Sequence, residues 1–178
     1  MRMSLLPAVI GFVFLAPAAS AQVNVTNTCP ADAPVAVNPG AVPKGAQSLV
    51  ATVTNRGPKP ITGVILAWRV TDSKGAFYVE HSTIDYAPSG ILFEPGKSAE
   101  ADVDLSFQQG RTLQAVEVTC LAVLYQGKGV WGDAKAPEVA RLRAVRQGIA
   151  AERKRLLGIY TREGISRLAD ELNRPVVR

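Results

Sequence analysis

The stretch LVATVTNRGPKPITGVILAWRV, residues 49–70, decides the fold expected for this chain. Its two apolar runs alternate with a period of two, so that Val64, Leu66 and Trp68 share one face of an expected strand. Residues 55–60, NRGPKP, lie between the runs. The two prolines there cannot donate a backbone hydrogen bond, and the glycine can take a positive φ. The stretch therefore predicts two strands that meet in a hairpin or a sandwich corner, with Trp68 closed into a core between two sheets.

Further short strands are predicted on both sides of this stretch. The longest, residues 113–125, is apolar on both faces in its second half, so we expect it at the centre of its sheet. In residues 99–105, small apolar residues alternate with Glu100, Asp102 and Asp104, which we interpret as a solvated sheet face and not as a cation site. Residues 22–136 hold seven to nine such segments between glycine and proline turns. This spacing is typical of an antiparallel β-sandwich.

The first 21 residues have the character of an export signal. An apolar run over residues 5–18 is followed by Ala19, Ser20 and Ala21, small residues of the kind that a signal peptidase reads. Two prolines interrupt the run, and it is shorter than the roughly 20 residues of a membrane-spanning helix. We therefore expect a signal peptide over residues 1–21 and a periplasmic or secreted protein that begins at Gln22.

Export affects how the two cysteines of the chain are interpreted. Cys29 and Cys120 can form a disulfide in an oxidising compartment, whereas a zinc or redox site would need closer spacing or more ligands. The sequence predicts such a disulfide. The alternative is that Cys120 is buried as a small apolar residue and that Cys29 is free.

From residue 137 onward, apolar residues recur with helical spacing, and the charge balance changes. Residues 137–178 hold ten Lys/Arg against five Asp/Glu, whereas residues 22–136 hold nine against ten. The glycines of this segment, and Thr161 as a helix N-cap, predict two or three shorter helices. Residues 137–178 are thus expected to form a basic helical extension.

Three roles are open for this extension. It packs on the sandwich, it binds a protein partner or a second copy of itself, or it lies on an anionic membrane surface. Nucleic acid is not an expected partner of an exported protein. The residues predicted to carry binding are basic and apolar side chains of the extension and one aromatic after a tight turn of the sandwich: Arg153, Lys154, Arg155, Leu156, Leu168 and Trp131.

Several generic motifs give the body a family resemblance. They are the N-x-G-x-x-P-I turn at residues 55–61, Trp68 on the next strand, F-x-P-G at residues 93–96 and G-K-G-V-W-G-D at residues 127–133. Together they make residues 34–134 similar to bacterial secreted immunoglobulin-like or fibronectin-type-III-like β-sandwich modules. The resemblance implies a scaffold, spacer or binding platform.

The sequence contains no motif that carries specific chemistry. The single histidine, His81, stands beside Ser82 and near Asp85, but neighbouring strand residues point to opposite faces, and no nucleophile elbow surrounds them. We expect no catalytic residue, metal site or cofactor. The function expected is that of an exported, non-catalytic interaction or structural module. The alternative is a small exported hydrolase or carbohydrate-active domain, whose carboxylates would converge.

Overall fold

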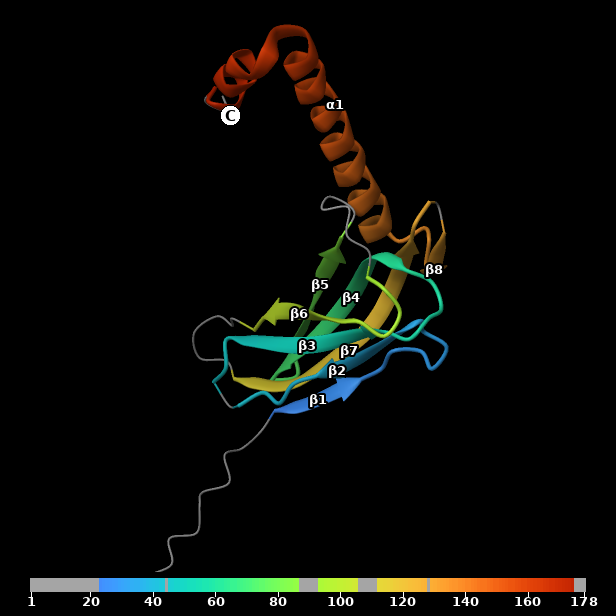
Figure 1. Ribbon diagram of the computed structural model, residues 1–178. Helices are drawn as coiled ribbons and strands as arrows, with labels where there is room; N and C mark the ends of the chain where they lie inside the picture. The colour runs from blue at the N-terminus through green and yellow to red at the C-terminus, as the bar shows by residue number, and fades with distance from the viewer. Residues whose placement is uncertain (1–22, 44, 87–92, 106–111, 128, 175–178) are drawn as a thin grey trace, which may run out of the picture.

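The computed structural model is a mainly β protein with a C-terminal helix, and it describes residues 23–174 except residues 44, 87–92, 106–111 and 128 (Figure 1). The predicted signal peptide lies outside the described residues. Two sheets form a β-sandwich, one with five strands in the order β1-β7-β4-β5, to which β8 adds beside β7, and one with three strands in the order β2-β3-β6. The elements are β1 (Asn24–Asn27), β2 (Val35–Pro39), β3 (Ser48–Asn55), β4 (Ile61–Asp72), β5 (Phe77–Asp85), β6 (Ser98–Asp104), β7 (Leu113–Tyr125), β8 (Val130–Gly132) and α1 (Pro137–Leu172).

The NRGPKP turn is a corner between the two sheets, because β3 and β4 belong to different sheets. Asn55 at the end of β3 is buried and holds this corner. Its amide nitrogen donates to the carbonyl oxygens of Lys59 at 3.0 Å and Phe93 at 2.8 Å, and its Oδ1 accepts from the amide of Gly57 at 2.9 Å. Trp68 is fully buried as predicted, and its Nε1 donates to Ser82 Oγ at 2.7 Å.

Strand pairing agrees with the predicted sandwich in most places. β7 lies inside its sheet between β4 and β1, and the acidic residues of β6 are exposed, as the sequence predicted. One pairing differs from a purely antiparallel sandwich: β1 runs parallel to β7, with Asn24 opposite Ala115 and Asn27 opposite Val118.

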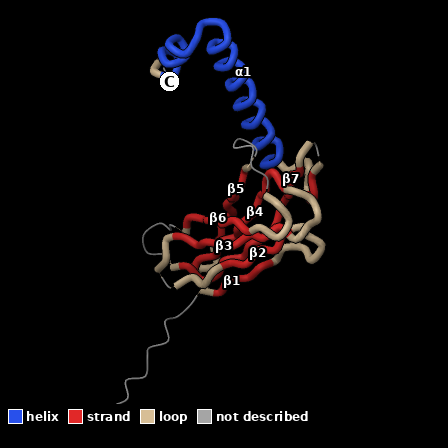
Figure 2. The backbone as a smooth tube through the Cα atoms, viewed as in Figure 1, coloured by secondary structure: helices blue, strands red, loops and turns tan. Residues whose placement is uncertain are grey.

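The C-terminal segment forms one helical run that is broken once, at Gly164. This residue has φ 81° and ψ −177°, a conformation that is essentially restricted to glycine. The prediction of two or three shorter helices is confirmed at its lower number, because Gly164 divides the run in two, whereas Gly148 and Gly158 do not interrupt it. The prediction that Thr161 caps the second helix was wrong. Thr161 lies inside the helix and donates back to the carbonyl oxygen of Leu157 at 2.8 Å. The break gives α1 a long leg, residues 137–163, and a short leg, residues 165–172, which turns back at the far end (Figure 2).

The first turns of α1 pack on the outer face of the five-stranded sheet. Val139 and Leu142 are buried there against Ile65, Ala122 and Leu124. Beyond these turns the helix rises away from the sandwich, as Figure 1 shows. We call residues 147–174 the arm. Among the described residues, no helix is both long enough and apolar enough to cross a membrane.

Candidate binding surface on the helical arm

A partly buried ion pair fixes the direction in which the arm leaves the sandwich. The guanidinium of Arg146 lies 2.7 Å from Asp85 Oδ1 and donates to the carbonyl oxygen of Thr62 at 2.7 Å. A side chain on Gly63 would collide with this group, because a Cβ there would lie 2.7 Å from Arg146 Nη2. The glycine in β4 therefore makes room for the arginine that anchors the helix.

Beyond Arg146 the arm exposes apolar side chains that the sandwich does not cover. Nine large hydrophobic residues are exposed in the described part of the chain, and five of them are on the arm. They are Ile149, Leu157, Tyr160, Ile165 and Leu172. An apolar surface concentrated on one projecting element is typical of an interaction site.

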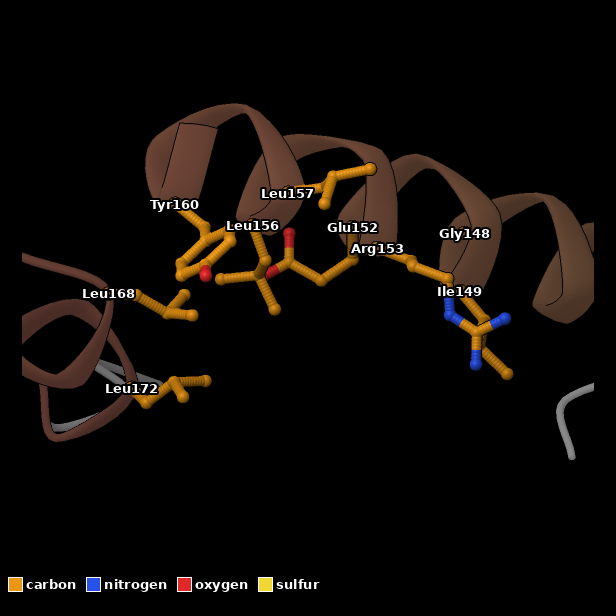
Figure 3. Close-up of a pocket in the computed structure, with 9 residues that line it drawn as sticks. All are labelled: Gly148, Ile149, Glu152, Arg153, Leu156, Leu157, Tyr160, Leu168 and Leu172. Atoms are coloured by element: carbon orange, nitrogen blue, oxygen red, sulfur yellow. The ribbon is translucent and has the colours of Figure 1, made fainter. Parts of the chain in front are cut away.

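The two legs of α1 line an open apolar groove of about 760 Å³. Figure 3 shows side chains of the long leg pointing toward Leu168 and Leu172 on the short leg. The residues that line the groove are Gly148, Ile149, Glu152, Arg153, Leu156, Leu157, Tyr160, Leu168 and Leu172. The groove exists because Gly164 reverses the chain and brings the short leg beside the long one.

Arg155 links the legs. Its Nη2 lies 2.8 Å from Glu152 Oε1 on the same leg, and its Nη1 lies 2.7 Å from Glu171 Oε1 on the short leg. Hydrogen bonds from this guanidinium lower the pKa of both carboxyl groups, and the carboxylates raise the pKa of Arg155. This cluster holds the short leg in place beside the groove.

The structure brings some of the predicted binding residues together and separates others. Leu156, Leu168 and Arg153 all line the groove, whereas Lys154 is exposed outside it. Arg155 binds Glu152 and Glu171 within the arm itself.

Trp131 lies apart from the groove. It is half-buried on β8, opposite Val123 of β7, and packs against the main core.

Sequence reasoning missed several of the groove residues. Ile149, Tyr160 and Leu172 line it together with the predicted leucines. Their helical spacing was visible, since Ile149, Leu156 and Tyr160 are seven and four residues apart, but the position of the chain reversal was not. Only the positive φ of Gly164 shows which apolar residues of the two legs face one another.

The two cysteines occupy matching positions on neighbouring strands. The parallel register of β1 and β7 pairs Asn27 with Val118, and continued by two residues it places Cys29 beside Cys120. Both thiols are free, and the Sγ atom of Cys29 lies 4.0 Å from the carbonyl oxygen of Val118. Burial raises the pKa of Cys120 to about 12, and the nearby Cys29 adds to that rise. Burial likewise raises the pKa of Cys29.

The residues considered for a catalytic triad face different partners. Ser82 Oγ accepts from Trp68, His81 Nδ1 lies 3.5 Å from Glu138 Oε1, and Asp85 binds Arg146. In the part of the chain that the structure describes, no three His, Cys, Asp or Glu side chains are grouped so that they could hold a metal ion. Comparison with known protein families, with curated proteins and with solved structures finds no match to this chain.

Proposed function

We propose that this chain is an exported, non-catalytic interaction module in which an immunoglobulin-like sandwich carries a helical arm that binds a protein partner. The observation that carries the proposal is the apolar groove between the two legs of the arm. A groove between helices, lined by leucine, isoleucine and tyrosine, fits the apolar face of another helix.

The way in which the arm is built supports this role. The Arg146 anchor and the buried turn at Val139 and Leu142 fix its base, so its direction does not depend on a partner. The internal cluster of Arg155 holds the short leg, so the groove exists before binding. A site that is preformed loses less conformational entropy on binding than a flexible one.

Export and a disulfide belong to the same proposal. Their support is the signal-like composition of residues 1–21 and the matching register of Cys29 and Cys120. In an oxidising compartment this pair would tie β1 to β7 and close the edge of the five-stranded sheet.

A photo-crosslinking experiment in the native host tests the proposed function. The photoreactive amino acid p-benzoylphenylalanine replaces Leu157, an exposed residue that lines the groove. In the matched control it replaces Val79 on β5. The two residues are 60% and 51% exposed. We expect a discrete protein adduct only from position 157, and we expect Leu168→Asp to abolish it. Equal adducts from both positions, or none from position 157, would contradict the proposal.

A further inference from the structure

The residues of the long leg that line the groove are complementary to one another. The two members of each pair lie at equal distances along the sequence on either side of the midpoint between positions 152 and 153. Each pair joins a small residue to a large one, an acid to a base, or two apolar residues. The pairs are Gly148 with Leu157, Ile149 with Leu156, Glu152 with Arg153 and, one turn further out, Val145 with Tyr160.

This pairing is what a two-fold symmetric contact requires. When two identical helices cross antiparallel, each residue meets the residue at the same distance on the other side of the axis. With the axis between positions 152 and 153, Leu157 would fill the space left by Gly148 of the second copy, and Ile149 would pack on Leu156. The acid at position 152 would meet the base at position 153, whereas a parallel contact would place like charges together.

We propose that the occupant of the groove is a second copy of this chain, whose long leg lies antiparallel to the first about an axis between Glu152 and Arg153. The proposal rests on the proposed function, because it names the partner of the same groove. It uses the exposed apolar residues of the arm that the sandwich leaves uncovered.

The position of the chain reversal fits this arrangement. The axis lies about 10 Å beyond Arg146, at a rise of 1.5 Å per residue. At that offset, Gly164 of one copy comes level with Arg141 of the other copy, whose helix is docked there on its own sandwich. Each long leg therefore ends at the level where the sandwich of the other copy begins. The two long legs pair only along the helical segment that contacts neither sandwich.

Sedimentation equilibrium of the purified protein tests the proposal. We expect a reversible dimer, and we expect Ile149→Asp to weaken it about tenfold or more, because a carboxylate would be buried against Leu156. Val79→Asp is the matched control: it places the same charge on an exposed apolar residue of β5 and should leave the dimer unchanged. Circular dichroism checks that each variant keeps its helix content.

A charge exchange tests the symmetry itself. Both exchanges are made in an Arg155→Gln background, so that the internal pair of Glu152 is absent from every variant compared. Glu152→Arg and Arg153→Glu should each weaken the dimer, because each places like charges on the axis. The double variant should regain affinity, because the exchange restores opposite charges in a two-fold contact. A double variant no tighter than the single ones would overturn the proposed axis.

Two further outcomes separate this proposal from the one on which it rests. A protein that stays monomeric up to submillimolar concentration while position 157 crosslinks to a different polypeptide would overturn the second copy and leave the proposed function standing. A monomer that binds vesicles of anionic phospholipid through the groove, with no protein adduct, would overturn both. An adduct of twice the chain mass supports both.

Discussion

At the scale of single residues, the orientation of the arm depends on one arginine that lies where a glycine makes room for it. The guanidinium group of Arg146 contacts both Asp85 and the carbonyl oxygen of Thr62. The side chain of Arg146 is 20% exposed and that of Asp85 is 17% exposed. An arginine with two such partners is poorly replaced by lysine, whose ammonium is a compact point charge. Arg146 therefore sets the direction of the arm and stabilises the contact between α1 and the sandwich.

Replacement of Arg146 should cost stability. Arg146→Ala leaves Asp85 and the Thr62 carbonyl without this donor, and we expect the free energy of unfolding to fall by about 2 kcal/mol. Urea unfolding followed by tryptophan fluorescence measures the change. Arg141→Ala, which removes an exposed arginine of the same helix, is the control and should change the value by less than about 0.5 kcal/mol. Equal effects of the two substitutions would show that the ion pair is not an anchor.

Oxidation of the two cysteines is a second prediction at this scale. Treatment with glutathione disulfide should join Cys29 to Cys120 in two exchange steps, which release two molecules of reduced glutathione and leave the protein two hydrogen atoms lighter. The bond closes a loop of about 90 residues and should add about 4 kcal/mol to the stability in the chain-entropy model. Intact mass and urea unfolding with and without reductant measure both effects. In a Cys29→Ser control, the oxidant should change neither the intact mass nor the stability. A wild-type mass that is unchanged after oxidation would refute the pairing.

At the scale of elements, the groove depends on the break in α1. Gly164 adopts a conformation that other residues avoid, so Gly164→Ala should favour a straight continuation of the long leg. We expect a larger hydrodynamic radius, unchanged or higher helix content and loss of the dimer. Gly158→Ala is the control, because Gly158 lies inside the helix and a Cβ there would meet nothing within 4 Å. If both variants behave alike, the reversal at Gly164 does not create the binding surface.

The same element should respond to acid. The pKa values of Glu152 and Glu171 are lowered by hydrogen bonds from Arg155, so the cluster stabilises the short leg above the ordinary carboxyl value of 4.5 and loses this effect as the pH falls through the lowered values. We expect the two legs to separate only at a pH below the ordinary carboxyl pKa, as these lowered values are passed. Energy transfer between dyes on the two legs measures the opening. An Arg155→Gln variant should lack this transition, and an identical transition in that variant would contradict the assignment.

At the scale of the whole molecule, the sequence predicted the sandwich well, because the alternation of apolar residues indicates which face of a strand is buried. Trp68, the inner position of β7 and the exposed acids of β6 follow from that pattern. For the turn at residues 55–60 the sequence allowed either a hairpin or a sandwich corner. Proline and glycine indicate where a strand ends, but they do not indicate which sheet the next strand joins. The structure shows a corner, in which Asn55 donates a long-range hydrogen bond to the carbonyl oxygen of Phe93.

The structure of the arm could be predicted from the sequence only in part. Helical spacing identified Leu156 and Leu168, but Gly148, Gly158 and Gly164 look alike in sequence, and only one of them reverses the chain. The role of Arg155 could not be predicted either, because Glu171 comes within reach only after that reversal. Contacts between distant parts of a helix depend on tertiary geometry, which local periodicity does not contain.

Hydrogen exchange measured at two protein concentrations shows whether the arm is the surface at which this molecule associates. We expect that raising the concentration through the dimer range slows exchange in the peptides covering the long leg beyond residue 147 and the short leg, while peptides of β1 to β8 exchange as before. Ile149→Asp should remove the difference. Protection that rises on the sandwich strands, with the arm unchanged, would contradict the account.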